Sequence, residues 1–478
     1  MQMSRPQILF FAFLTLASLT LQAQSLEEAR ILLKEGNYIQ AKPVFEKLAS
    51  AQPGNGNHRL NLGICLLHTG EAEAAIEHLE VAVKKRIPGG QLHLGQAYMA
   101  VYRLEEAVTT LEAYRNELTK RKRATDEVDL IVDEAKNRLR MLKSVEQVCF
   151  IDSVVVDKAR LLSVYALPTE VGKVEYLAQV WSQAGAGDDQ TMYQTELGNR
   201  AVLSLPGTDG HRKLAMTYRQ GEQWGTPELL PAPINEECSD TAYPFLMPDG
   251  TTLYYATNGK GLGGYDLYVT RHNTRENTFF VPANLGMPFN SPGNDYLYVV
   301  DEFNELGWFA TDRNQAPGKV CVYVFIPNKS KKTYDYETTD LPKLARLARI
   351  HAIQETWIDE AAVAQARRRL EALRNRPSIE EGINPGEAFI INHQTIYHHA
   401  GQFRSAEARR QYIAYLKMQD DLQMQERKLE SMRQAYVNST QQASMAPGLL
   451  DLEQRVEQMH AELSTLAKQI RLLENATF

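Results

Sequence analysis

The feature that most constrains the fold is a repeated order of short strands and tight turns between Asp240 and Ile326. The first copy has expected strands at 242–247, 252–256 and 265–269. Its first two strands flank the turn Pro248-Asp249-Gly250, in which proline presets φ, aspartate bonds its own backbone and glycine accepts a positive φ. The second copy has expected strands at 295–300, 306–310 and 320–326. Such a repeat predicts an architecture of recurring sheets.

The repeated unit resembles a blade of the WD40-like, TolB-type periplasmic β-propellers. The motif residues that carry the resemblance, and that we expect to be structural, are Pro248, Asp249, Gly250, Gly263, Gly264, Tyr265 and Asp266. The match weakens in the second copy, where Asn304-Glu305 replaces the Asp-Gly turn. The resemblance implies three or four blades over 147–328, at the low end of the usual range of about four to eight. The ring is then small, open or completed by another chain.

A second repeat covers the amino-terminal part of the chain, from 25 to 146. Small and large apolar residues recur about every 34 residues, which is the tetratricopeptide pattern of paired helices. The recurring positions are Ala41, Ala75 and Ala107, then Phe45, Leu79 and Leu111, with Leu62-Gly63 and Leu94-Gly95 before them. Three units are about the minimum for a stable stack, and a helix at 125–143 is expected to cap it.

Helical arrays of this kind commonly hold a partner protein in their concave groove. Arg59, Asn61 and His93 lie on first helices of repeats and are the candidate partner-binding residues. The alternatives are that each belongs to a solvated face and that the array is only a spacer.

The amino-terminal sequence predicts that the protein is exported. Arg5 precedes an apolar run at 8–21, which is shorter than the roughly 20 residues of a membrane span. We expect a signal peptide at 1–24, cut near Ala23, with an uncleaved anchor as the alternative. The four cysteines lack metal-ligand spacing, and if the first and last strands of the propeller pair, Cys149 and Cys321 could form a disulfide.

The carboxy-terminal part is predicted to be mostly helical. The region 329–404 reads as a helix-rich linker with short strands near 388–397, and a lysine-rich stretch at 328–332 begins it. Two helices with heptad spacing are expected in 405–478, with a bend at 444–448. They could pair as a coiled-coil hairpin, with a second copy or with a partner, and Gln425 at a core position could set the register. The fold class is therefore multidomain, α and β: a tetratricopeptide α-solenoid, a small or partial β-propeller and a coiled-coil hairpin.

No motif for catalysis, cofactor binding or metal binding is found. The sequence lacks a Gly-x-Ser-x-Gly elbow, a P-loop, a His-Glu-x-x-His pair and a dinucleotide fingerprint. Asp240, Asp266 and Asp295 are expected to bond turn amides, with a calcium ring as the less favoured alternative. Several tyrosines could line a sugar-binding face, although packing between blades explains most of them: Tyr243, Tyr254, Tyr255, Tyr265 and Tyr268. We therefore expect a protein that is not an enzyme, and a hydrolase with an unrecognised site is kept as a further alternative.

The order of modules is similar to the repeat-plus-propeller component of type IX secretion. That family continues into a carboxypeptidase-regulatory-like domain and an OmpA-like domain, which this chain does not show, so peptidoglycan anchoring is not carried over. The resemblance implies a non-enzymatic scaffold of the periplasm or cell envelope that binds envelope proteins and self-associates through the coiled coil. The alternative is a glycan- or peptide-binding module that uses the loop face of the propeller. The net charge of −7 gives no reason to expect nucleic acid, and membrane association is expected only through partners, including at the outer membrane.

Overall fold

The structure is a computed structural model. It describes residues 26–181, 190–220, 223–236, 239–259, 261–273, 275–276, 278–375, 389–392, 395–397, 399–437 and 442–477. The chain divides into two compact units, one ending at Lys143 and one starting at Ser144. The expected signal peptide at 1–24 lies outside the described residues. Within the ranges given above, no helix has the length and apolar character that crossing a membrane requires.

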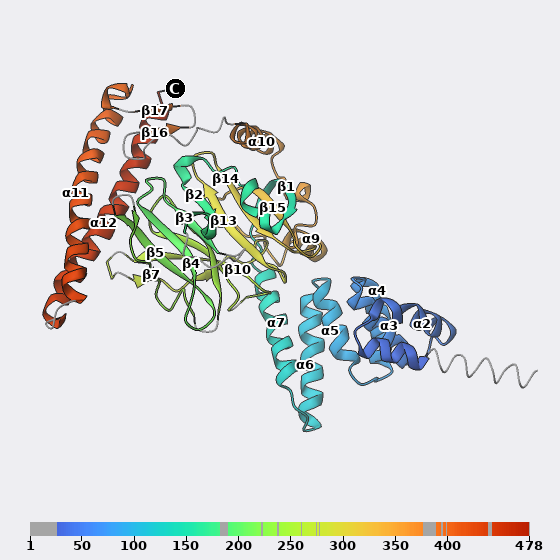
Figure 1. The fold of residues 1–478 in the computed structure, drawn as a ribbon. Helices are drawn as coiled ribbons and strands as arrows, with labels where there is room; N and C mark the ends of the chain where they lie inside the picture. Colours follow the sequence, from blue (N-terminus) through green and yellow to red (C-terminus); the bar gives the residue numbers. More distant parts are fainter. Residues whose placement is uncertain are drawn as a thin grey trace, which may run out of the picture. The chain divides into compact units, whose positions relative to one another are not determined.

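The first unit is a row of paired antiparallel helices (Figure 1). After a helix over 26–34, the helices are α2 (Tyr38–Ala51), α3 (Gly56–His68), α4 (Ala72–Lys84), α5 (Gly90–Ala100), α6 (Leu104–Lys120) and α7 (Asp126–Leu142). The turns inside the pairs contain residues with positive φ, namely Gly36, Gly70 and Tyr102. The helical array predicted from the spacing is therefore present, and α7 occupies the position of the expected capping helix.

The recurring glycines are explained by close approach of the paired helices. A Cβ on Gly63 would lie 2.6 Å from the side chain of Leu79, and one on Gly95 would lie 2.4 Å from that of Leu111. Both leucines are fully buried. The small residue and the large one therefore occupy one shared space in each pair.

Filling that space should destabilise the array. We expect Gly95→Leu to lower the free energy of unfolding of the helical unit by about 1–3 kcal/mol, because overpacking forces the helices apart. Hydrogen exchange of the α5 and α6 amides in the full chain measures the effect. Gly54→Leu is the matched control, since a Cβ on Gly54 meets nothing within 4 Å. Equal protection in the two variants would contradict the packing described here.

The second unit contains three larger antiparallel sheets and, near the carboxy-terminus, a two-stranded one (Figure 1). The first consists of β2 (Lys173–Tyr176), β3 (Thr191–Gln194), β4 (Arg200–Pro206), β5 (Arg212–Gln220), β6 (Gln223–Trp224) and β7 (Glu228–Leu229). The second consists of β8 (Thr241–Leu246), β9 (Thr252–Thr257), β10 (Asp266–Asn273), β11 (Thr278–Phe279) and β12 (Ala283–Asn284). The third has the order β1-β15-β14-β13, with β1 (Cys149–Asp157), β13 (Asp295–Asp301), β14 (Leu306–Thr311) and β15 (Lys319–Ile326). No closed ring of sheets is formed by the described strands.

The second and third sheets repeat one another in detail. The β8–β9 pair has a register shift between Ala242 and Phe245, and the β13–β14 pair has one between Tyr296 and Val299. Within each shift lies a residue with positive φ, Tyr243 in one and Leu297 in the other. A shared core of buried side chains joins the three sheets. The internal repeat expected from the sequence is thus present as repeated sheets.

The predicted disulfide between Cys149 and Cys321 is wrong. β1 does pair with β15, the last strand of the sheet region, but the register places Cys321 opposite Val155 and Cys149 opposite Ile326. Both cysteines are free thiols, as is Cys65. The pairing of two strands does not fix which residues oppose each other, so the spacing alone misled the prediction. Cys238 lies outside the described residues.

The stretch after β15 is not the free linker that its lysines suggested. Lys332 accepts a hydrogen bond from the amide of Gln147, and Tyr334 donates one to the carbonyl of Val145. Helices α9 (Leu341–Ala348) and α10 (Glu360–Arg374) follow. Val363, Ala366, Leu370 and Leu373 of α10 belong to the core of the sheets, so α10 is an integral part of the sheet region.

The chain ends in a helical hairpin. Strands β16 (Phe389–Asn392) and β17 (Thr395–Tyr397) precede α11 (Ala406–Val437) and α12 (Gln442–Asn475), which lie side by side (Figure 1). Arg433 pairs with Glu453, and Glu426 lies 3.0 Å from His460, so the helices run antiparallel. Of the alternatives for the heptad helices, pairing within one chain is the one observed. The bend expected at 444–448 does not occur, because α12 continues through Pro447.

Candidate functional site

The helical array presents a half-buried apolar stripe on the first helices of its pairs. On α3, Leu62, Gly63 and Leu66 are buried. Leu60, Ile64 and Leu67 recur at three- and four-residue intervals on the opposite side of the helix and are each half-buried. On α5, half-buried Leu92 has the same relation to buried Leu94 and Gly95 as Leu60 has to Leu62 and Gly63, whereas polar Gln96 stands at the position of Ile64. The stripe is therefore separate from the apolar side chains that hold the pairs together.

The three partner-binding residues predicted from the sequence lie outside this stripe. Arg59 donates a hydrogen bond to the carbonyl of Pro53 (3.1 Å) and lies 2.5 Å from the His78 ring on α4. His93 lies 3.1 Å from the Gln96 side chain within α5. Asn61 is half-buried, and its side chain makes no hydrogen bond within the described part of the array. Arg59 and His93 are thus engaged in contacts within the repeats, whereas the Asn61 side chain is not hydrogen-bonded within the described part of the array.

Two histidines of the array are held neutral by their surroundings. Burial lowers the pKa of His93, and burial together with the Arg59 guanidinium lowers the pKa of His78. A neutral imidazole at His78 can accept a hydrogen bond from Arg59, which explains the short contact. These side chains therefore support the array rather than offer positive charge to a ligand.

The motif residues of the first strand repeat form two turns. Gly250 has φ of 71°, and Asp249 accepts hydrogen bonds from the amides of Thr251 and Thr252. In the glycine-rich loop, a Cβ on Gly263 would lie 2.3 Å from the carbonyl oxygen of Pro292, and Gly264 donates to the Gly293 carbonyl. Asp249, Gly250, Gly263 and Gly264 therefore each have a structural contact that their chemistry explains.

Two buried aspartates lie behind the glycine-rich loop. Asp266 is fully buried and accepts hydrogen bonds from the amides of Leu262 and Gly263. Asp295, also fully buried, pairs with Arg313 at 2.8 Å and accepts from the Ser291 amide. Burial, together with the Asp295 carboxylate, raises the pKa of Asp266 to about 7. Burial also raises the pKa of Asp295, although Arg313 opposes the rise.

The carboxylates of the sheet region do not assemble into a metal site. No group of three or more His, Cys, Asp or Glu side chains in the described residues is placed to hold a metal ion. Asp240 accepts from the amide of Arg212 at the start of β5, so it bonds a distant strand rather than an amide of its own turn. The tyrosines weighed as a sugar-binding face pack on one another: Tyr243 with Tyr265 and Tyr296, Tyr254 with Tyr298, and Tyr255 with Tyr268.

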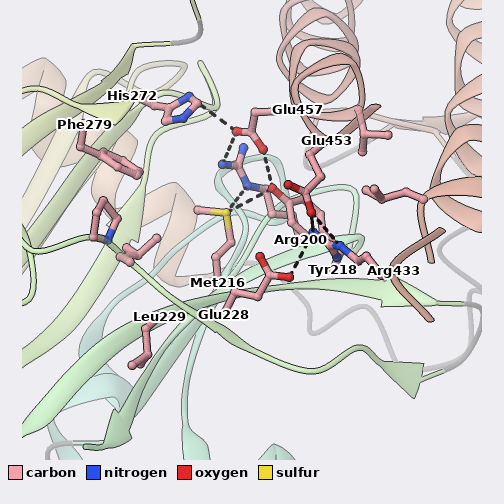
Figure 2. A pocket seen from close by; sticks show the side chains of 14 residues that line it. Arg200, Met216, Tyr218, Glu228, Leu229, His272, Phe279, Arg433, Glu453 and Glu457 are labelled. Atoms are coloured by element: carbon pink, nitrogen blue, oxygen red, sulfur yellow. Dashed lines mark hydrogen bonds and ion pairs between the residues drawn. The ribbon is translucent and has the colours of Figure 1, made fainter. Parts of the chain in front are cut away.

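A pocket of about 190 Å³ lies between the sheets and the carboxy-terminal hairpin. Its polar lining is a set of mutually paired charges (Figure 2). Glu457 of α12 binds Arg200 of β4 at 2.7 Å and accepts from the Tyr218 hydroxyl, and His272 lies 3.8 Å away. Arg433 of α11 pairs with Glu228 of β7 and Glu453 of α12. The charges of this pocket thus join the hairpin to the sheets.

The central carboxylate of this pocket remains ionised. Burial alone would raise the pKa of Glu457, but Arg200, the Tyr218 hydroxyl and the nearby histidines outweigh burial and hold the pKa below its usual range. The Arg200 guanidinium also donates to the Gly250 carbonyl at 3.0 Å and to the Met216 sulfur. The Arg200 guanidinium and the Glu457 carboxylate are therefore both engaged by neighbouring groups of the protein.

Comparison with known proteins supports the repeat assignment. A family model for the tetratricopeptide repeat matches residues 26–90, which contain the helix over 26–34 and α2 to α4. No curated protein shows significant similarity to the chain. The amino-terminal unit therefore contains repeats of a class that mediates interactions between proteins.

Proposed function

We propose that the protein is a non-enzymatic scaffold that binds partner proteins through its tetratricopeptide array. The observation that carries the proposal is the helical array itself, in which α3 and α5 offer an apolar stripe that is separate from the core. Apolar stripes of paired helices suit an amphipathic helix or an extended peptide. The absence of catalytic, cofactor or metal motifs from the sequence is the basis for proposing a binding role rather than an enzyme.

We also propose that the protein works in the periplasm or cell envelope. The apolar run at 8–21 behind Arg5 supports export. The repeated sheets support a partial β-propeller of the TolB type, and the order of modules supports a relationship to the repeat-plus-propeller component of type IX secretion, with envelope proteins as partners. The mass of the protein purified from cells tests the export step: a chain lacking about the first 23 residues is expected, and an intact chain would contradict it.

Charge placed in the apolar stripe should abolish partner binding. We expect Leu60→Asp combined with Ile64→Asp to reduce the protein recovered with the chain after crosslinking in intact cells by at least about tenfold, because a desolvated apolar contact cannot accept a carboxylate. Circular dichroism checks that the helices remain. Ile39→Asp is the matched control, since Ile39 is 78% exposed on α2, away from buried Ala41 and Phe45. If the double variant recovers as much crosslinked protein as the parent, the stripe is excluded as the partner-binding surface.

A second function, binding of a glycan or peptide at the loops of the sheets, remains the alternative proposal. It is favoured by the glycine-rich loop at 259–264, which lies at the opposite end of β9 from the turn contacted by the hairpin. Binding of soluble glycans to the full chain, unaffected by the Leu60 and Ile64 substitutions, would support it over the scaffold.

A further inference from the structure

The carboxy-terminal hairpin has an apolar core of its own. Its buried residues come from the β16–β17 pair, the segment after it and the two long helices: Phe389, Ile391, Tyr397, Phe403, Ala408, Tyr412, Tyr415, Leu422, Leu429, Leu452, Val456, Leu463, Ala467 and Ile470. Among the described residues of the sheet region, Leu197 is the one apolar side chain that packs against this core. The buried Glu474 carboxylate closes the hairpin by accepting hydrogen bonds from the Tyr397 hydroxyl and the Arg404 amide.

The contact between the hairpin and the sheets is largely polar, with the Tyr218 ring 5.0 Å from the His460 ring of α12 as its aromatic part. Besides the Glu457 cluster, Ser464 donates to the Pro248 carbonyl, Lys468 pairs with Glu302, and Gln454 donates to the Arg275 carbonyl at 3.2 Å. The contrast is with α10, which places four apolar side chains in the core of the sheets. No residue of α11 or α12 in the described ranges belongs to that core. Burial of apolar surface is the main source of stability in protein packing, and it therefore contributes little to this contact.

A contact of this kind favours reversible separation of the hairpin from the sheets. The partly exposed pair of Lys468 and Glu302 contributes little net free energy and weakens with salt. The buried Arg200–Glu457 pair adds little more, because the cost of removing both charges from water offsets much of their attraction. A hairpin with its own apolar core is expected to stay folded when it leaves. The side chains of Arg200 and Glu457 are 3% and 13% exposed in the docked state, and release would return the Glu457 carboxylate to water. The turns that α12 contacts, at 248–250 and 302–305, would then be exposed.

We propose that the hairpin formed by β16, β17, α11 and α12 is a releasable cover over one turn face of the sheets. In the docked state it blocks the Pro248-Asp249-Gly250 turn and the neighbouring Glu302 turn. In the released state it remains folded and leaves that face exposed to solvent. The proposal is independent of the tetratricopeptide stripe, which lies in the other unit.

Hydrogen exchange of the full chain tests whether the hairpin covers the turn and can be released from it. In Glu457→Gln, exchange of the amides at 249–252 should accelerate about tenfold, because Arg200 loses its counter-charge. Amides of α12 around Leu463, Ala467 and Ile470 should keep their protection. Asp451→Asn is the matched control, since Asp451 pairs with exposed Arg455 on the same helix.

A reversible disulfide between the hairpin and the turn that it covers provides a second measurement. A Cβ on Gly250 would lie 4.0 Å from the Cβ of Ala461, within the range that a disulfide spans. Gly250→Cys with Ala461→Cys, added to Glu457→Gln, should protect the turn more when oxidised than when reduced. The two redox forms of the same variant share the strain that a cysteine adds at φ of 71°, so their difference reports the lock alone. The proposal is overturned if Glu457→Gln leaves the turn protected, or if the Leu463–Ile470 amides lose protection together with the turn, because the hairpin would then not be a separate folded body.

Discussion

Arg313→Met is expected to lower the free energy of unfolding of the sheet region by about 3–5 kcal/mol, because it leaves the Asp295 carboxylate buried without its counter-charge. Arg313 donates to Asp295 at 2.8 Å and to the Pro288 carbonyl at 2.7 Å. It also bonds the Thr311 hydroxyl at 3.0 Å. Asp295 is fully buried, so water cannot replace the lost donor. The loss therefore includes both a charge pair and the hydrogen bonds that join two loops.

Tryptophan fluorescence measures this change in the sheet region alone. All four tryptophans, Trp181, Trp224, Trp308 and Trp357, lie after Ser144, so denaturant unfolding followed at the indole reports only on the second unit. Lys319→Met is the matched control, because Lys319 pairs with Asp157 on the surface, where both side chains are about half exposed. A loss below about 1 kcal/mol for Arg313→Met would contradict the buried pair.

The stability of the sheet region should fall as the pH rises from 4 to 7 through the contribution of Asp266. An unfolded aspartate titrates near pH 4, whereas burial and the Asp295 carboxylate raise the pKa of folded Asp266 to about 7. The folded state therefore keeps a proton that the unfolded state releases. This contribution is complete below about pH 4 and is lost progressively up to pH 7, with an upper limit of about 4 kcal/mol.

Asp266→Asn isolates that contribution. The amide oxygen can still accept the hydrogen bonds from the Leu262 and Gly263 amides, and the side chain no longer titrates. We expect the variant to be more stable than the parent above pH 7 and to lose this part of the pH dependence, measured by tryptophan fluorescence at each pH. Asp157→Asn serves as the control, because Lys319 lowers the pKa of Asp157 and its contribution has the opposite sign. Parallel pH curves for Asp266→Asn and the parent would contradict the raised pKa.

The elements with local, periodic signals were predictable from the sequence. Gly63 and Gly95 recur because each faces a leucine of the paired helix, and that requirement repeats with the helix pair. The Pro248-Asp249-Gly250 turn was predictable because its dihedral angles and its side-chain bonds are set by residues within the turn. The heptad spacing of α11 and α12 was equally clear in the sequence. The structure shows that the two helices pair with each other.

The features that depend on contacts distant in the sequence were not predictable. The docking of α12 rests on Glu457, Ser464 and Lys468, polar residues outside the apolar positions of the heptads, and no periodicity marks their partners on the sheets. Arg59, Asn61 and His93 were predicted as binding residues because they lie on first helices of repeats, and their spacing could not show that Arg59 contacts His78 of the paired helix. The helical period does contain a signal for the apolar stripe, because Leu60 and Ile64 are apolar residues on the face opposite the core.

A photoreactive residue placed in the stripe of α3 tests most directly whether this chain is a scaffold for other proteins. A photocrosslinking amino acid at Ile64, in the full chain in living cells, should give discrete protein adducts on illumination. The same residue at Ile39, exposed on α2, should not. Adducts found only at Ile64 are the result expected of a partner-binding array. No adduct at Ile64, or the same adducts at both positions, would contradict binding at the stripe and leave the loops of the sheets as the place to search for a ligand.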